Sequence, residues 1–235
     1  MRKISTLLLA LLIMACSNEK NNLIVKGSIK DLKKGVVYLK KVKDTSLVTL
    51  DSVAINGNSV FELHSPIESP QVFFLYLDKN SAIEDRIVFF ADKGTTEINT
   101  TLKNFVFDAK IKGSKQQKVF EEYNKTITQI NNRNLDLIKE SFEAEKAGDT
   151  AKIDSLKKEA NSILKRKYLY TVNFAINNKD SEVAPYLALS EIYNAKLSLL
   201  DTINNSLTPK VKASKYGKEL DAFIKQIKEE EESTK

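Results

Sequence analysis

Two periodicities follow one another along the chain and change near residue 113. Between residues 23 and 113, β-branched and aromatic residues form short runs that Gly, Asn, Asp and Pro interrupt, a pattern typical of strands. These runs predict strands over residues 23–29, 35–42, 47–55, 59–63, 71–77, 86–90, 95–101, 105–107 and 109–112. About eight short strands at this spacing predict an antiparallel β-sandwich or a barrel-like sheet.

Two features refine the predicted sheet. Asn56-Gly57 lies between two apolar runs, and because both residues tolerate positive φ, the pair predicts a β-hairpin. The runs over 71–77 and 86–90 are the most apolar, so we expect them to lie centrally. Their aromatic residues are Phe73, Phe74, Tyr76, Phe89 and Phe90. Since adjacent strand residues point to opposite faces, we expect these rings to pack against the other sheet or the helices rather than to display a ligand surface.

Beyond Gly113 the apolar period lengthens to about 3.6 residues, which predicts α-helices. Ser114 can cap the first helix and Gly148 can end it, and Asp149 or Thr150 then opens a second helix. The inward stripes comprise Val119, Phe120, Tyr123, Ile127, Ile130, Leu137, Ile138 and Phe142, then Ile153, Leu156, Ala160, Ile163, Leu164, Tyr168, Val172 and Ile176. We expect an antiparallel pair whose stripes face each other or the sheet.

Shorter helices complete the prediction of an α+β chain, in which a sheet is followed by a helical hairpin or bundle. Ser181 caps the first of them, and Pro185 fits its opening turn, where a missing N–H group costs least. A second helix spans 195–205 and ends before Pro209, and a last helix runs into the glutamates 229–232, a solvated tail. The residues expected to face inward are Leu187, Ile192, Tyr193, Leu220, Phe223, Ile224 and Ile227.

The start of the chain has the layout of a secretory signal. Basic residues precede an apolar run over residues 8–14, and the small Ala15 stands before Cys16. Residues 13–16 resemble the lipobox of bacterial lipoproteins. In that family the cysteine thiol takes a diacylglyceryl group, which implies lipidation of Cys16 and cleavage after Ala15. The alternative is an ordinary signal peptide with an unmodified cysteine.

These signals divide the chain into four parts. They are a signal peptide over residues 1–15, a tether over 16–22, a β-rich domain over 23–113 and a helical domain over 114–235. The apolar run of the signal is shorter than the roughly 20 residues that span a bilayer. We therefore expect the lipid to attach the protein to a membrane of the cell envelope. We favour the outer membrane, on either its periplasmic or its surface side.

The charge pattern argues against nucleic-acid binding. The formal charge of the chain is +6 and falls to +4 once Arg2 and Lys3 leave with the signal. Acidic residues are interspersed throughout, and a nucleic-acid surface would need a concentrated basic patch. A short run of lysines could meet anionic lipid head groups, although a solvated helix start is the simpler interpretation. These lysines are Lys110, Lys112, Lys115 and Lys118.

Few side chains offer chemistry. Cys16 is the only cysteine, so the chain can form no internal disulfide, and a dithiol mechanism needs a second thiol. His64 is the only histidine, and its place at the end of a predicted strand indicates a surface residue. We expect Asp51 or Ser52 to bond the local backbone and to fix the register of the predicted hairpin.

Four acidic residues in loops after apolar strands could bind a hard cation through their oxygens. They are Asp78, Glu84, Asp85 and Asp92. Because no calcium-loop pattern surrounds them, solvated loop charges are the favoured interpretation. We therefore assign no catalytic residue, no metal and no cofactor, and we do not expect an enzyme.

Several short motifs, taken in order, resemble one family. They are Gly35-Val36-Val37-Tyr38-Leu39, Asp51-Ser52-Val53 followed by Asn56-Gly57 and Phe61, Ile111-Lys112-Gly113-Ser114, residues 181–189, and Ser214-Lys215-Tyr216-Gly217-Lys218. Together they resemble domain of unknown function 4369, the β-rich N-terminal domain that precedes a thioredoxin-like domain of TlpA type in Gram-negative envelope lipoproteins. Those relatives continue into a Cys-x-x-Cys active site, whereas this chain stops at Lys235 without one. The resemblance therefore implies the accessory module without redox activity.

We expect, on this basis, a non-catalytic cell-envelope lipoprotein that acts as a binding or interaction module for a ligand or an envelope protein. The alternative is an auxiliary of a periplasmic thiol–disulfide system that docks a separate thioredoxin-like protein. A hydrolase or similar enzyme is the least favoured interpretation, because no complete catalytic set is evident.

Replacing Cys16 by Ser should release the protein from the membrane. Two or three acyl chains hold a protein stably on a bilayer, and the serine hydroxyl is not expected to be acylated in their place. Fractionation of cells before and after a salt wash measures the effect. A Cys16→Ser variant that stays with the washed membranes would contradict the lipid anchor.

Overall fold

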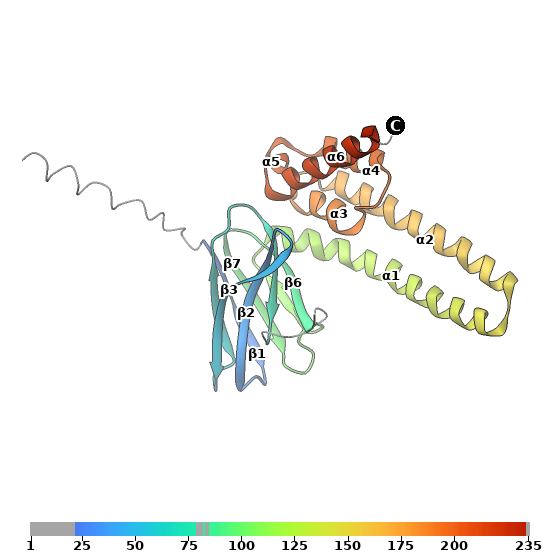
Figure 1. The fold of residues 1–235 in the computed structure, drawn as a ribbon. Coiled ribbons are helices and arrows are strands. Elements are labelled where there is room, and N and C mark those ends of the chain that lie inside the picture. Colours follow the sequence, from blue (N-terminus) through green and yellow to red (C-terminus); the bar gives the residue numbers. More distant parts are fainter. Residues whose placement is uncertain (1–21, 79–81, 83–84, 234–235) are drawn as a thin grey trace, which may run out of the picture.

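The computed structural model describes residues 22–78, 82 and 85–233, and in these residues it confirms the α+β class, with a β-sandwich followed by helices (Figure 1). The strands are β1 (Leu23–Lys30), β2 (Lys34–Lys43), β3 (Ser46–Asn56), β4 (Val60–Ser65), β5 (Gln71–Tyr76), β6 (Arg86–Ala91), β7 (Gly94–Thr101) and β8 (Lys110–Lys112). The helices are α1 (Lys115–Ala147), α2 (Thr150–Asn177), α3 (Val183–Glu191), α4 (Leu197–Ser206), α5 (Pro209–Lys212) and α6 (Lys215–Ser233).

Two four-stranded sheets face each other, with strand orders β4-β1-β7-β8 and β3-β2-β5-β6. Alternating residues of both sheets form a shared apolar core. Its fully buried members include Leu23, Ile29, Leu39, Leu63, Phe73, Leu75, Phe89 and Ile98. One pair departs from the predicted antiparallel arrangement, because β1 and β7 run parallel. A parallel pair needs a long crossover, and here β2 to β6 provide it.

The predicted hairpin at Asn56-Gly57 is wrong. Strands β3 and β4 belong to different sheets, so this turn carries the chain across the sandwich. Gly57 does adopt positive φ, at 90°, and its N–H donates to the carbonyl of Lys33 over 2.8 Å. A turn with positive φ can join two strands of one sheet or lead from one sheet to the other. The Asn-Gly signal in the sequence does not distinguish these two cases. The hairpin forms instead between β2 and β3, where Asp44 has φ 55°.

Two further expectations for the sheet are corrected. The predicted strand over 105–107 is a turn, held by a hydrogen bond of 2.7 Å from the hydroxyl of Thr100 to the carbonyl of Phe105. The ring of Phe107 is 93% exposed there, so no partner strand covers it. Of the two most apolar strands only β5 is central, whereas β6 is an edge strand. The apolar character of β6 reflects helices that cover it, not neighbouring strands on both sides.

Helices α1 and α2 form a long antiparallel arm that extends away from the sandwich (Figure 1). The predicted caps of α1 and α2 are confirmed, whereas the predicted cap Ser181 is wrong, because Glu182 occupies the N-cap position of α3. The hydroxyl of Ser114 accepts a hydrogen bond from the N–H of Gln117, and Gly148 ends α1 with φ 67°. Asp149 caps α2 by accepting from the N–H of Lys152. Among the described residues, none of the helices is both long and apolar enough to cross a membrane.

The near half of α1 packs on the second sheet through Phe120, Tyr123 and Ile127, as the stripe predicted. The far half does not follow the prediction, since Ile138 is 60% and Phe142 56% exposed. There α1 extends beyond the edge of the sheet and packs only on α2, where Leu137 and Leu156 share a small core. A helix with one partner buries a narrower stripe than a helix between two layers.

The later helices follow the pattern with two corrections. Leu187, Ile192, Leu220 and Ile224 are buried, whereas Tyr193 is 57% exposed because α3 has already ended before it. Phe223 and Ile227 are partly buried against the same core. The glutamates 229–232 are exposed as expected, but they continue helix α6 rather than form a separate tail.

Replacing Ile127 by Ala should cost roughly 2–5 kcal/mol of folding free energy, because the side chain is buried in the core that the helices share with the second sheet. Replacing Ile138 by Ala, which makes the same chemical change on the exposed face of the same helix, should stay within about 0.5 kcal/mol. Chemical denaturation of the two variants measures the difference. Equal and small costs would show that α1 does not pack on the sheet.

Candidate functional site

The strand pair β5–β6 is covered on both faces. Phe73 and Phe89 stack inside the sandwich with ring centroids 6.0 Å apart. On the other face, Phe90 lies among the rings of Phe120, Tyr186 and Tyr216, at 5.5, 5.2 and 6.0 Å. The prediction that these strand aromatics are core residues is therefore confirmed. This second core joins the sandwich to α1, α3 and α6.

Helix side chains also satisfy backbone groups that the second sheet leaves unpaired. The N–H of Val72 in β5 donates to the hydroxyl of Tyr216 over 3.0 Å, and the N–H of Phe90 in β6 donates to Oε1 of Gln117 over 2.8 Å. Both bonds are buried, so water cannot accept from these N–H groups. In each case the helix side chain supplies the acceptor that a neighbouring strand would otherwise provide. Burial raises the pKa of the Tyr216 hydroxyl, which keeps it neutral at physiological pH.

The segment that presents Tyr216 is fixed by its neighbours in the sequence. The hydroxyl of Ser214 donates to the carbonyl of Val211 over 2.7 Å, at the junction of α5 and α6. Gly217 allows α5 to approach, because a Cβ atom at this position would lie 2.1 Å from the same carbonyl oxygen. The motif Ser214–Lys218 thus positions the tyrosine ring against the sheet.

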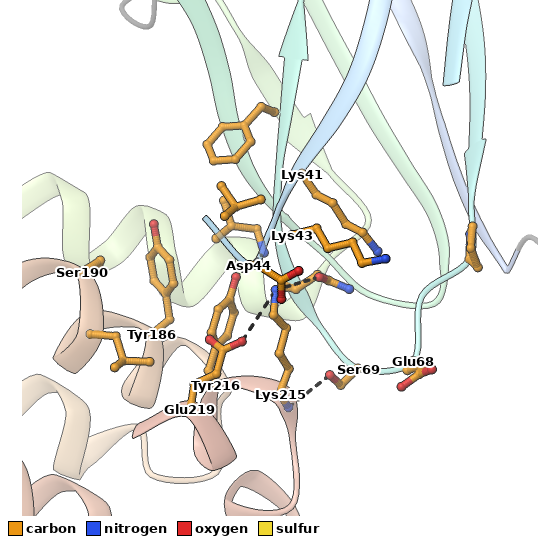
Figure 2. A pocket seen from close by; sticks show the side chains of 16 residues that line it. Lys41, Lys43, Asp44, Glu68, Ser69, Tyr186, Ser190, Lys215, Tyr216 and Glu219 are labelled. Carbon is orange, nitrogen blue, oxygen red and sulfur yellow. Dashed lines mark hydrogen bonds and ion pairs between the residues drawn. The ribbon is translucent and has the colours of Figure 1, made fainter. Parts of the chain in front are cut away.

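A cleft of about 730 Å³ lies beside Tyr216, between the end of the sandwich and the helices. Its walls come from four distant segments, namely the β2–β3 hairpin (41–44), the approach to β5 (66–72), α3 (186–190) and the start of α6 (215–219). Figure 2 shows these side chains around the hollow. Phe74, Tyr186 and Leu189 give it apolar surface.

Charged groups of both signs line the cleft. The amine of Lys215 reaches into it and donates to Oε1 of Gln71 over 3.3 Å, with the carboxylate of Glu219 at 3.9 Å (Figure 2). Burial raises the pKa of Glu219, and the charge of Lys215 opposes that rise. Lys41 and Lys43 line the opposite wall, on the hairpin. The arrangement offers charged and hydrogen-bonding groups beside aromatic surface, which suits ligand binding.

Sequence reasoning did not find this cleft. None of its residues indicates a binding site by itself. Only two of the four walls contain a recognisable sequence feature, namely the basic end of β2 and the motif at Ser214–Lys218. The side chains that the sequence analysis considered for chemistry, such as His64 and Asp51, lie elsewhere.

His64 lies on β4, half exposed, with Nε2 3.3 Å from a carboxylate oxygen of Glu62. Its backbone N–H donates to Oδ2 of Asp51 over 2.8 Å, while Oδ1 of Asp51 accepts from the N–H of Ser52, also at 2.8 Å. Asp51 therefore binds backbone, as predicted. It does so across the sandwich, from an edge strand of one sheet to an edge strand of the other, and not within a hairpin.

Three of the four acidic loop residues, Asp78, Asp85 and Asp92, lie in the described part of the chain. In the part of the chain that the structure describes, no group of three His, Cys, Asp or Glu side chains is placed to hold an ion. Asp92 accepts a hydrogen bond of 2.9 Å from the N–H of Lys115 at the start of α1. Glu84, Cys16 and Ala15 lie outside the described residues, so the predicted lipidation and cleavage positions stay predictions.

The run of four basic residues, Lys110, Lys112, Lys115 and Lys118, is exposed at the start of the helical half. None of them lines the cleft. Their exposure fits the solvated helix start that the sequence favoured.

Comparison with known proteins agrees with the sequence motifs that lie between Gly35 and Ser114. Residues 23–120 match the family model described as Domain of unknown function (DUF4369), so the chain carries a domain of this family. The match covers the whole sandwich and the first turns of α1, up to Phe120. No curated protein and no solved structure matches the chain.

Replacing Tyr216 by Phe should cost roughly 1–3 kcal/mol of folding free energy, because the buried N–H of Val72 loses its acceptor while the ring still fits. The exposed Tyr193→Phe makes the same change without such a partner and should leave stability within about 0.5 kcal/mol. Denaturation curves of the two variants test this. A Tyr216→Phe protein as stable as the control would show that the hydroxyl does not satisfy the strand.

Glu182, at the start of α3, gives the fold a pH dependence. Its carboxyl is buried and accepts a hydrogen bond of 2.6 Å from the side-chain amide of Gln116 on α1. Burial raises its pKa above the ordinary 4.5. Asp92 and Asp180 add to the rise, and Lys210 opposes it.

A carboxyl with a raised folded-state pKa contributes stability that is complete below 4.5 and is lost as the pH rises through the raised value. The free energy of unfolding of the wild type, relative to Glu182→Gln, should therefore fall as the pH rises above 4.5. The exposed Glu231→Gln serves as the control and should show no such trend. A constant difference between wild type and Glu182→Gln would contradict the assignment.

Proposed function

We propose that the protein is a non-catalytic binding module of the cell envelope, anchored by a lipid on Cys16, and that its ligand occupies the cleft beside Tyr216. The observation that carries the proposal is the cleft itself. It is about 730 Å³ in volume and combines aromatic walls with a few charged and amide groups. Binding sites for small molecules commonly have this size and this mixture.

The place of the cleft in the fold supports the anchored arrangement. The side-chain oxygen of Asn22 accepts a hydrogen bond of 2.8 Å from the N–H of Ile67. Ile67 lies between Pro66 and Glu68, two residues of the cleft wall. The chain that leads back to Cys16 therefore enters the fold next to the cleft. A lipid on Cys16 and the short tether over residues 16–22 would hold the cleft close to the membrane surface.

Site-specific photo-crosslinking in intact cells tests the binding function. A benzoylphenylalanine in place of Leu189, in the cleft, should give an adduct of defined mass. The same replacement at Leu164 is the matched control and should give none, because this leucine of α2 lies outside the cleft and is 47% exposed, contrary to its predicted inward position. Absence of an adduct at Leu189, with the protein folded and anchored, would refute the cleft as a ligand site.

A second candidate function is that of an auxiliary that docks a separate thioredoxin-like protein. The exposed apolar stripe of Leu135, Ile138 and Phe142 on the far half of α1 favours a protein partner. A crosslinker at Phe142 separates the two functions. An adduct with a thioredoxin-like protein there, with none at Leu189, would favour docking over ligand binding in the cleft.

A further inference from the structure

The ladder between β2 and β5 stops before either strand does. Its described pairs are Tyr38–Tyr76, Leu39–Leu75 and Lys40–Phe74. Strand β2 continues to Lys43 alongside β3, and β5 begins as early as Gln71 alongside β6. Both unpaired stretches line the cleft. The cleft is therefore the space between two neighbouring strands that have separated.

The backbone of Val42 faces this space. In the β2–β3 hairpin a two-residue loop joins Lys43 to Ser46, and such a closing pair exchanges both of its hydrogen bonds. The bonding direction alternates along an antiparallel pair, so the N–H and C=O of Val42 point away from β3. Val42 has no ladder partner on β5 among the described pairs.

The hydrogen-bonding direction of β5, on the other side of the cleft, independently gives the same register between β2 and β5. The N–H of Phe90 points out of β6 to Gln117, so Val72, which lies opposite Phe90, must also point away from β6. Its N–H does so and donates to Tyr216. Val42 and Val72 would thus be a hydrogen-bonded pair if the two strands stayed together. The Tyr216 hydroxyl takes the place of β2 on the β5 side, and the β2 side stays open to the cleft.

We propose that an extended peptide segment of a partner pairs with β2 at Val42 as an added strand in the cleft. The proposal deepens the proposed function and rests on it. Main-chain hydrogen bonds supply affinity in this mode of recognition, and pockets for alternate side chains supply selectivity.

The two faces of β2 define which side chains the peptide carries. Lys40 points to the helix side, where its amine lies 4.2 Å from the ring centroid of Tyr76, so Val42 points to that side too. On the helix side the peptide meets Tyr186 and Leu189, which favours apolar residues. Lys41 and Lys43 lie on the opposite face of β2, which favours acidic residues. The expected ligand alternates apolar and acidic side chains.

Selection of random heptapeptides displayed on phage, against the full-length protein in detergent, tests the inference. The enriched peptides should alternate apolar and acidic residues, and one of them is then synthesised as the probe. Val42→Pro should weaken its binding at least about tenfold, because the N–H that faces the cleft is lost while the ladder to β3 is kept. Val42→Thr keeps the N–H and should bind within about twofold of wild type.

A second measurement does not depend on how the proline variant folds. The same synthetic peptide, methylated on alternate backbone nitrogens, keeps its side chains but loses its strand hydrogen bonds, so one of its two methylation registers should abolish binding. Retained binding by both methylated peptides, or selection of no peptide, would overturn the inference. If Leu189 still gives its adduct in cells, the proposed function survives that failure, whereas loss of the adduct refutes the function itself.

Discussion

The hydrogen bond from the N–H of Val72 to the hydroxyl of Tyr216 is the interaction on which the arrangement of sheet, helices and cleft depends. A buried N–H without an acceptor costs about twice what a satisfied hydrogen bond contributes. Strand β5 meets this requirement with a residue 144 positions away instead of with its neighbour β2. Gln117 does the same for Phe90 on the edge strand β6. The helical half is therefore not an appendage, because it completes the bonding of the second sheet.

The same bond explains why a cleft exists. If β2 and β5 stayed paired to their ends, Val42 would occupy the position that the Tyr216 hydroxyl now takes, and the hollow would close. The tyrosine reaches that position because Ser214 and Gly217 bring α5 and the first turn of α6 together at the junction. Its ring also stands at 5.1 Å from that of Tyr186, which forms the α3 wall of the cleft. The Tyr216 side chain thus accepts the hydrogen bond of β5, packs against the α3 wall and occupies the space between β2 and β5.

Sequence patterns predicted most of the elements and few of their partners. The change of period at residue 113, the caps Ser114 and Gly148 and the strand aromatics report local structure, which the chain specifies within a few residues. The turn at Asn56-Gly57 shows the limit of such local prediction. Positive φ at Gly57 was predictable, but whether the following strand joins the same sheet depends on contacts far away in the sequence.

The cleft could not be predicted for the same reason. Its walls are four segments, the first and last of which are 171 positions apart between Asp44 and Lys215, and none carries a recognisable motif for binding. The prediction that Ile138 and Phe142 face inward was wrong for a different reason. Their spacing is correct for a helix buried on a broad face, but the sheet ends before it reaches them.

That exposed half of the arm is held with little apolar contact. Leu137, Ala144 and Leu156 form its buried seam. Arg133 adds ion pairs of 2.7 Å to Glu140 and 2.8 Å to Glu159, but exposed pairs of this kind contribute little to stability because water and salt screen them. The near half, by contrast, is tied to the sheet by rings and by buried hydrogen bonds. Local opening of the arm therefore starts at its tip near Gly148 and meets its barrier where Ile130 and Ile127 reach the second core, so that motion of the arm leaves Tyr216 and the cleft in place.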